Sequence, residues 1–321
     1  MDPLRFDNRV AVVTGAGRNL GRVYALALAE RGARVVVNDL GVAISDTDGS
    51  GDGPAENPAV AVVREIEALG GEAVVSTDSV ATEEGGAAIV DTAVEAFGRV
   101  DIVVNNAGVV RTAPFADLPP ELVDPVLATQ IASVFHVTRP AWRLMAAQGY
   151  GRIVNVSSGS AFAGVPGLSA YGGAKAGVIG LTRQMATEGA GLGIKVNVIA
   201  PYAKTRPGTG FGPIPPSDEL NAWMRPEFLT PLVNLLAHEE CPVTGECFAA
   251  GAGYVSRVVW STTEGLVDRN MTTETLLRDW EHVMDTDGMA VVGHDGGGTT
   301  HKMLVGFTPP QSPPTPKSSS A

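Results

Sequence analysis

The sequence predicts an α/β fold in which helices cover both faces of a single doubly wound parallel sheet of about seven strands. Three observations support this class. Short apolar stretches rich in β-branched residues recur along the chain without alternating with polar residues, which is typical of strands buried on both faces. Stretches of helical length separate them. Glycine, asparagine and serine follow several of the apolar stretches, at the sheet edge where such folds bind their ligands.

The chain of 321 residues, 44% of them hydrophobic, is long enough for one large domain or two small ones. Strands and helices alternate without a break, so we predict one domain over residues 1–290. Residues 291–321 form a predicted C-terminal extension, whose last part is rich in proline and serine and is expected to be disordered. Right-handed crossovers should join the predicted strands, which cover residues 9–14, 34–38, 72–76, 101–105, 152–157, 195–199 and 247–250.

The first strand leads through a glycine-rich turn into a helical stretch. The turn reads Thr-Gly-Ala-Gly-Arg-Asn-Leu-Gly over residues 14–21, and the helical stretch covers residues 23–30. Such a turn lets backbone N–H groups reach a pyrophosphate at the N-terminus of the helix. We therefore predict a dinucleotide site, with an ordinary tight turn as the alternative.

The second strand ends at Asp39, about twenty residues after the glycines. A carboxylate at this place can accept hydrogen bonds from both ribose hydroxyls of NAD, and it repels the additional phosphate of NADP. We therefore predict NAD as the cofactor. A simple strand-end cap is the alternative role for Asp39.

Ser158, Tyr171 and Lys175 are candidates for the chemistry. Four positions separate Tyr171 from Lys175, so the two side chains share one face of a helix. A tyrosine is ordinarily protonated near neutral pH, but we expect a nearby ammonium to bring the pKa of Tyr171 toward neutrality, where proton transfer is most effective. Ser158 can then hold the substrate oxygen by a hydrogen bond. By itself the Tyr-x-x-x-Lys pattern also occurs by chance.

Together with Asn105-Asn106-Ala107-Gly108, these patterns resemble the short-chain dehydrogenase/reductase family. The resemblance runs from about residue 6 to about residue 288. More narrowly, the chain is similar to the (3R)-hydroxyacyl-CoA dehydrogenase domains of peroxisomal multifunctional enzymes, through residues 35–41, 78–80, 97–101, 199–201 and 238–253.

The resemblance implies a Rossmann-like fold and a set of site residues. It assigns catalysis to Ser158, Tyr171 and Lys175, with Lys175 also holding the nicotinamide ribose. It places Asp78 near the adenine and Asn106 beside the nicotinamide. It also implies a homodimer or homotetramer that pairs through the helix at residues 171–188. The predicted cofactor-binding residues are Gly15, Gly17, Arg18, Asn19, Leu20, Gly21, Asp39, Asp78, Ser79, Val80, Asn106, Ala107, Gly108, Tyr171, Lys175 and Pro201.

The chain departs from the family pattern at two positions. Asn19 stands where the family has the middle glycine of the turn; asparagine tolerates a positive φ but carries a Cβ near the phosphates. Gln130 stands where many members have an asparagine that fixes a water in a proton relay. Glutamine carries the same amide on a longer stem, so the relay can persist with shifted geometry.

The composition argues against several kinds of partner. A net charge of -12 does not suit a nucleic-acid surface, and it also opposes the polyanion coenzyme A unless local arginines or lysines intervene. No apolar run approaches about eighteen residues, so we expect no membrane span. Cys241 and Cys247 fit neither a disulfide framework nor a four-ligand zinc site, so we expect no metal. A reducing, cytoplasmic setting follows most simply from this use of cysteine. No charged and then apolar leader precedes the first strand, so we do not expect secretion.

Two irregular segments have alternative interpretations. Residues 46–57 begin like a calcium-binding loop, but Asn57 stands where that loop needs a glutamate, which favours a solvated loop. Residues 203–217 follow a strand expected to end at the nicotinamide. They are interpreted as a lid over the substrate, in which Lys204, Arg206 and Arg225 meet acidic groups, or as an exposed loop with solvated charges.

These observations predict an NAD-dependent oxidoreductase that acts on a small secondary alcohol or ketone. The resemblance implies a 3-hydroxyacyl thioester as substrate, and hence a role in fatty acid metabolism. A steroid or another secondary alcohol is the alternative, because the same catalytic residues serve many substrates. A non-catalytic interaction protein that senses NAD is a remote alternative.

Overall fold

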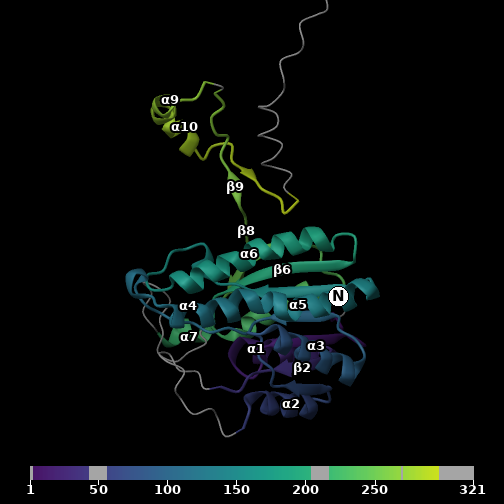
Figure 1. Cartoon of the computed structure of the whole chain (residues 1–321). Helices are drawn as coiled ribbons and strands as arrows, with labels where there is room; N and C mark the ends of the chain where they lie inside the picture. Colours follow the sequence, from purple (N-terminus) through teal and green to yellow (C-terminus); the bar gives the residue numbers. More distant parts are fainter. Residues whose placement is uncertain (1–2, 43–55, 204–216, 269, 296–321) are drawn as a thin grey trace, which may run out of the picture. The chain divides into compact units, whose positions relative to one another are not determined.

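The computed structural model describes residues 3–42, 56–203, 217–268 and 270–295 (Figure 1). Its contacts divide the chain into two compact units, Met1–Val258 and Val259–Ala321, which we describe separately. This division falls before the boundary predicted at residue 290, and the extent of the functional domain stays a prediction. The predicted lid at residues 204–216 and residues 46–55 of the predicted loop lie outside the described residues.

The first unit contains a mostly parallel sheet with the strand order β3-β2-β1-β4-β5-β6-β7-β8. The order reverses between β1 and β4, which creates a crevice at the carboxyl ends of these two strands. The strands are β1 (Val10–Thr14), β2 (Arg34–Asn38), β3 (Ala73–Ser76), β4 (Ile102–Asn105), β5 (Gly151–Val156), β6 (Ile194–Pro201), β7 (Cys247–Gly251) and β8 (Tyr254–Val258).

All seven predicted strands are present, but the predicted number was one too low. The missed strand, β8, pairs with β7 in the antiparallel direction and lies at the edge of the sheet. Its side chains are mostly exposed, so it lacks the apolar run that identifies the buried strands. A turn with positive φ at Ala252 and Gly253 reverses the chain between β7 and β8.

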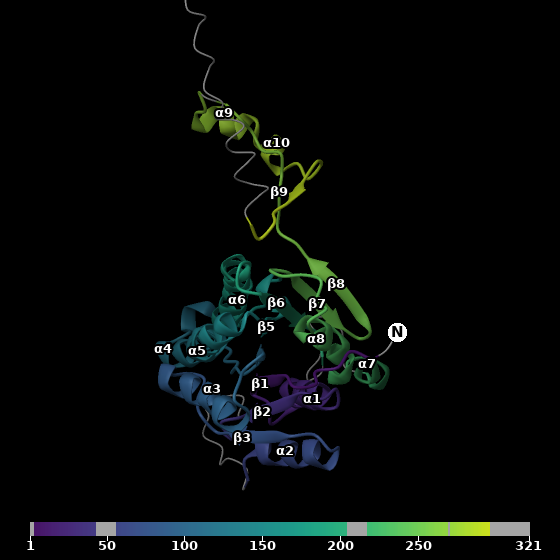
Figure 2. The ribbon, with the colours of Figure 1, turned by 90° about the vertical axis from the view of Figure 1, so that its right-hand side faces the viewer.

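Helices cover both faces of the sheet, as Figure 2 shows. One face carries α1 (Asn19–Ala29), α2 (Pro58–Ala68) and α8 (Thr230–Ala237), and the other carries α3 (Glu83–Phe97), α5 (Ser133–Gln148) and α6 (Ser169–Gly189). The described part of this unit also contains α4 (Pro120–Leu127) and α7 (Asp218–Trp223). None of the helices in the described ranges is long and apolar enough to span a bilayer.

Strand β1 illustrates why the apolar runs do not alternate. Ala11 and Val13 pack into the core beneath α1, α2 and α8, whereas Val10 and Val12 pack into the core beneath α3 and α5. Both faces of the strand are therefore buried, and every position must be apolar. The site residues at the carboxyl end of this strand rest on a rigid, fully packed element.

The second unit has little core of its own in its described residues. Two short strands, β9 (Ser261–Thr262) and β10 (Ala290–Val291), form an antiparallel pair. The helices α9 (Thr273–Arg278) and α10 (Trp280–Met284) contain no buried residue. A capping box in which Thr272 and Thr275 exchange hydrogen bonds begins α9.

Candidate functional site

A cavity of about 630 Å³ lies at the carboxyl ends of the parallel strands, around the point where the strand order reverses. It brings together all of the predicted site residues except Gly17, Gly21 and Ser158. The lining comprises Gly15, Arg18, Asn19, Leu20, Asn38, Asp39, Leu40, Val42, Asp78, Ser79, Val80, Asn106, Ala107, Gly108, Val109, Val110, Arg111, Thr129, Gln130, Val156, Ser157, Tyr171, Lys175 and Pro201.

The glycine-rich turn is packed tightly against the end of β4. Gly15 has a φ of 61°, and a Cβ atom on it would lie 2.8 Å from the Cα of Ala107. A Cβ on Gly21 would lie 2.1 Å from the carbonyl oxygen of Gly15. These positions therefore require glycine, for backbone conformation at Gly15 and for close approach at both. Gly21 lies beneath the cavity and shapes it without lining it.

Asn19 adopts the conformation for which the family uses glycine. Its φ is 47°, in the left-handed region that asparagine enters at lower cost than other residues with a Cβ. Asparagine can therefore occupy this position of the turn without a large backbone penalty. The Asn19 side chain is exposed and lines the cavity.

The N-terminus of α1 opens onto the cavity without a side-chain cap. Arg18 precedes the helix in an extended conformation, and its side chain makes no capping hydrogen bond. The first N–H groups of a helix have no partner within the helix and favour an anion. Arg18, Asn19 and Leu20 all line the cavity at this end. The arrangement fits a pyrophosphate.

Asp39 lies at the end of β2, next to the glycine turn. Its Oδ2 accepts a hydrogen bond from the backbone N–H of Gly17 at 3.0 Å, and its Oδ1 accepts one from Gly41 at 2.9 Å. Each carboxylate oxygen can accept a further hydrogen bond, so the group can still receive ribose hydroxyls. Gly17 thus fixes the orientation of Asp39. Nearby Asp78 accepts a hydrogen bond from the hydroxyl of Ser76 at 3.2 Å.

Asn106 ties the end of β4 to the glycine turn. Its side-chain Nδ2 donates to the carbonyl oxygens of Thr14 and Gly15, at 2.9 and 3.1 Å. Its backbone N–H donates to the Thr14 hydroxyl at 3.0 Å. The side-chain nitrogen of Asn106 therefore holds two parts of the site together, in addition to lining the cavity beside Ala107 and Gly108.

Tyr171 and Lys175 lie one turn apart on α6 and line the same cavity, as the spacing predicts. The Nζ of Lys175 is 5.7 Å from the centre of the Tyr171 ring. Lys175 is 4% exposed and donates a hydrogen bond of 2.6 Å to the carbonyl oxygen of Val156, at the end of β5. Burial lowers the pKa of Lys175 to about 7.

Ser158 follows β5 and begins a short 3-10 turn. Its Oγ accepts hydrogen bonds from the backbone N–H and the hydroxyl of Ser160, at 3.3 and 3.1 Å. These contacts fix its rotamer. The preceding residue, Ser157, lines the cavity and donates from its Oγ to the carbonyl oxygen of Lys175 at 2.8 Å. Ser157 was not predicted as a site residue, although its place directly after a buried strand could have indicated it.

Gln130 lies in a π-helical turn, Ala128–Ala132, between α4 and α5. Its Nε2 donates to the carbonyl oxygen of Val109 at 2.7 Å, whereas its buried Oε1 has no hydrogen-bond partner among the described residues. A buried acceptor left unpaired is costly, and π-turns often accompany functional sites. Gln130 also lines the cavity, so its amide lies at the boundary between the candidate site and the core.

The sequence reasoning missed the stretch Val109, Val110 and Arg111, which continues the cavity wall beyond the Asn-Asn-Ala-Gly segment. Arg111 is partly buried, and its guanidinium donates to the carbonyl oxygen of Val110 at 3.0 Å. Its position three residues after Gly108 could have indicated it, because residues that follow a parallel strand collect at the ligand-binding edge. Arg111 adds a local positive charge to an acidic protein.

Residues 46–55 of the calcium-like loop lie outside the described residues, whereas Asn57 and the two cysteines are described. In the described part of the chain, no group of three His, Cys, Asp or Glu side chains is arranged to hold a metal. Asn57 begins α2 and accepts a hydrogen bond from the backbone N–H of Ala59 at 2.9 Å. Cys241 and Cys247 are buried free thiols, and burial raises the pKa of Cys247 to about 11, which makes it unreactive.

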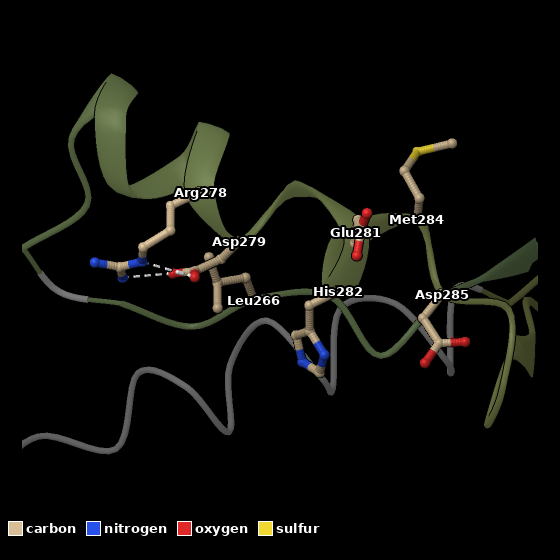
Figure 3. Close-up of a pocket in the computed structure, with 7 residues that line it drawn as sticks. All are labelled: Leu266, Arg278, Asp279, Glu281, His282, Met284 and Asp285. Carbon is tan, nitrogen blue, oxygen red and sulfur yellow. Dashed lines mark hydrogen bonds and ion pairs between the residues drawn. The ribbon is translucent and has the colours of Figure 1, made fainter.

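A second hollow, of about 670 Å³, lies within the second unit (Figure 3). It is lined by residues of α9, α10 and the adjoining segments. Arg278 is paired with Asp279 at 2.6 Å, and in Figure 3 Met284 points away from His282. None of the predicted site residues lines this hollow, so the cavity of the first unit is the candidate site.

Comparison with known proteins agrees with this geometry. A family model described as short chain dehydrogenase matches residues 9–207. The chain is 43% identical over 287 residues to the peroxisomal multifunctional enzyme type 2 of Mus musculus, covering 88% of this chain and 37% of that enzyme. It is 42% identical over 287 residues to a putative short-chain type dehydrogenase/reductase of Mycobacterium tuberculosis, covering 89% of this chain and 97% of that protein.

Among solved structures, the chain is similar to a short chain dehydrogenase from Mycobacterium avium. The TM-score is 0.74 at 36% sequence identity, and the match covers 87% of this chain and 95% of the other. The chain thus spans nearly the whole of the two mycobacterial proteins but only a little over a third of the mouse multifunctional enzyme.

Proposed function

Because the chain belongs to the short-chain dehydrogenase family, we propose that it transfers a hydride between NAD and a secondary alcohol or ketone, with a 3-hydroxyacyl thioester as its substrate. One observation carries the proposal. Tyr171 and Lys175 line the same cavity as Asp39 and the uncapped N-terminus of α1. The proposed proton-transfer group and the proposed dinucleotide site therefore share one cavity.

The residues present fit NAD. The N-terminus of α1 would receive the pyrophosphate, and Asp39 would receive the ribose hydroxyls, with its carboxylate already oriented by Gly17 and Gly41. Gly15 and Gly108 allow the backbone of the cavity wall to pack closely, since a Cβ on Gly108 would lie 2.4 Å from the amide nitrogen of Gln130. Lys175 would hold the nicotinamide ribose, and NAD, when bound, supplies the carbon that accepts the hydride.

The chain's own residues move the proton. Ser158 Oγ, held by Ser160, would orient the substrate oxygen by a hydrogen bond. The Tyr171 hydroxyl would exchange its proton with that oxygen, as a base in oxidation and as an acid in reduction. Lys175 lies one helical turn away, and in its protonated form it would stabilise the tyrosinate.

The substrate class rests on relatives and on local charge. The mouse relative is named a peroxisomal multifunctional enzyme, and a relative from Synechocystis, 35% identical over 260 residues, is named a 3-oxoacyl-[acyl-carrier-protein] reductase. Arg111 offers a positive charge on the cavity wall that helps an acidic protein accept an anionic thioester carrier. A steroid or another secondary alcohol remains the second candidate, because the catalytic residues do not distinguish among them.

Absorbance of the reduced cofactor tests the proposal directly. The protein is offered 3-hydroxyacyl-CoAs, steroid alcohols and short secondary alcohols, each with NAD and with NADP. We expect NAD reduction with the hydroxyacyl-CoAs. If steroids were turned over in preference to the hydroxyacyl-CoAs, a steroid would be the substrate instead. A preference for NADP would show that NADP, rather than NAD, is the cofactor. Tight NAD binding without turnover of any substrate would favour a sensor protein.

We also propose a cytoplasmic location, a homodimer or homotetramer that pairs through α6, and a functional domain that extends to about residue 290. The aligned length of 287 residues in the mouse relative supports this extent. The mouse relative is named peroxisomal, so fractionation of the source cells is the test of location. Light scattering of the purified protein tests the oligomeric state.

A further inference from the structure

Tyr202 stands at the carboxyl end of β6, directly after Pro201, which lines the cavity. No sequence pattern indicated it. Its backbone N–H donates to the carbonyl oxygen of Ala250 at 2.7 Å. Its own carbonyl oxygen packs so closely against Gly251 that a Cβ on that residue would lie only 2.0 Å from it. Only glycine at position 251 allows this close approach. The side chain therefore starts from a fixed point at the ligand-binding edge.

The phenol of Tyr202 lies against Gly159, the residue that follows Ser158. A Cβ on Gly159 would lie 2.3 Å from the Tyr202 Oη and 2.7 Å from its Cζ, so the phenol occupies the space that a side chain at position 159 would fill. Ser158 begins the same short turn and is tied to Ser160 within it. The Tyr202 hydroxyl thus lies beside the turn that begins at Ser158, and the Ser158 hydroxyl is expected to hold the reacting oxygen.

The Tyr202 side chain is open to a ligand. The residue is 38% exposed, and its hydroxyl forms no hydrogen bond with any of the described residues. The segment between Ser158 and Tyr171 also exposes Phe162 and Val165, which are apolar. A hydroxyl donor beside an apolar segment suits a substrate that carries a second oxygen on an otherwise apolar chain.

On the basis of the proposed function, we propose that Tyr202 is a specificity-determining residue whose hydroxyl donates a hydrogen bond to the thioester carbonyl of a 3-hydroxyacyl substrate. In such a substrate the carbonyl carbon lies two bonds from the reacting carbon, so its oxygen can lie beside the oxygen held by Ser158. The acyl chain then follows Phe162 and Val165. A simple secondary alcohol has no group to receive this hydrogen bond.

The experiment compares two ligands that differ only in that carbonyl. Binding of 3-hydroxybutyryl-CoA, and of its thioether analogue in which a CH₂ replaces the carbonyl, is measured by calorimetry in the presence of NADH. The wild-type protein is expected to bind the thioester about tenfold more tightly, as for one hydrogen bond in a partly exposed site. Tyr202→Phe is expected to remove this preference and leave binding of the thioether unchanged.

Two further variants complete the test. Tyr254→Phe removes a phenol hydroxyl from a different, exposed tyrosine on β8, so it should keep the wild-type preference for the thioester. Gly159→Ala places a Cβ where the phenol lies, so it should lose the preference although the hydroxyl is still present. The proposal is overturned if Tyr202→Phe keeps the preference for the thioester, or if it weakens the binding of both ligands equally. Failure of the wild-type protein to reduce NAD with 3-hydroxybutyryl-CoA would instead overturn the proposed function, on which this inference depends.

Discussion

The ammonium of Lys175 lies 2.6 Å from the carbonyl oxygen of Val156, and this hydrogen bond joins helix α6 to the end of strand β5. This hydrogen bond is almost completely buried, and burial brings the pKa of Lys175 down to about 7 from its ordinary value of 10.5. Near neutral pH, Lys175 is therefore present in both its charged and its neutral form. An anionic neighbour, such as a tyrosinate at Tyr171, favours the charged state.

The buried lysine should destabilise the protein without ligand in a pH-dependent manner. Because its folded pKa is lower than its unfolded pKa, the cost is complete below about pH 7 and disappears as the pH rises toward 10.5. We expect Lys175→Met to raise the free energy of unfolding at pH 7 by a few kcal/mol, and the gain to shrink between pH 7 and pH 10. Urea unfolding at several pH values measures this difference.

Lys195→Met provides a control for the loss of a lysine, since Lys195 also donates to a backbone carbonyl, that of Cys241, but is only partly buried. If the gain in the free energy of unfolding for Lys175→Met stayed constant from pH 7 to pH 10, the lowered pKa of Lys175 would be wrong.

Replacing Tyr171 with phenylalanine should separate chemistry from cofactor binding. The phenol hydroxyl is the proposed proton donor and acceptor, so kcat should fall by roughly a thousandfold. The dissociation constant of NAD should change by less than about threefold, because the glycine turn and Asp39 are untouched. Steady-state kinetics and fluorescence titration with NADH measure the two quantities. Turnover comparable to that of a Tyr254→Phe control would remove Tyr171 from the role.

Asp39 should decide between the two nicotinamide cofactors. Asp39→Ala removes the charge that repels a 2′-phosphate, and it leaves Arg18 at the same end of the cavity to attract one. The ratio of kcat/KM for NAD to that for NADP should fall at least about tenfold.

Asp39→Asn tests whether charge or hydrogen bonding is responsible, because it removes the charge but keeps an acceptor for Gly17 or Gly41. A cofactor preference that neither variant alters would rule out the ribose assignment.

Replacing Asn19 with alanine should cost more stability than replacing it with glycine. Its φ of 47° costs an alanine about 1 kcal/mol more than it costs a glycine, because the Cβ crowds the following carbonyl. We expect Asn19→Ala to lower the melting temperature by a few degrees and Asn19→Gly to leave it nearly unchanged. Glycine should also bind NAD at least as tightly, since it removes a Cβ from the phosphate site. Equal melting temperatures for the two variants would disagree with this backbone conformation.

Gln130 should affect turnover more than cofactor binding. Its unpaired, buried Oε1 is proposed to hold a water in the proton relay behind Lys175. Gln130→Met keeps the length of the side chain but removes the amide, and we expect kcat to fall about tenfold while NAD affinity stays within about threefold. Gln130→Glu, which retains an acceptor at the same place, should recover part of the loss. Unchanged kcat in Gln130→Met would exclude the relay role.

The fold could be predicted almost completely because its signals are local. Buried parallel strands need apolar residues at every position, so the ends of β1 to β7 were all predicted to within two residues. The edge strand β8 was missed because its outward side chains face solvent and carry no such pattern. Likewise, the positive φ at Asn19 was foreseeable from residue type, whereas the contact of the Tyr202 phenol with Gly159 was not, since 43 positions of sequence separate them.

The sequence by itself determined which residues follow each strand and that Tyr171 and Lys175 share one helix face, because strand and helix periods relate neighbours along the chain. Only the tertiary structure decided how far Lys175 is buried and that the Val156 carbonyl oxygen accepts its hydrogen bond. It also decided that Gly17 orients Asp39, and that the Gln130 oxygen has no partner among the described residues. Burial and hydrogen-bond partners depend on atoms contributed by distant segments, which meet only when the sheet and its helices have packed.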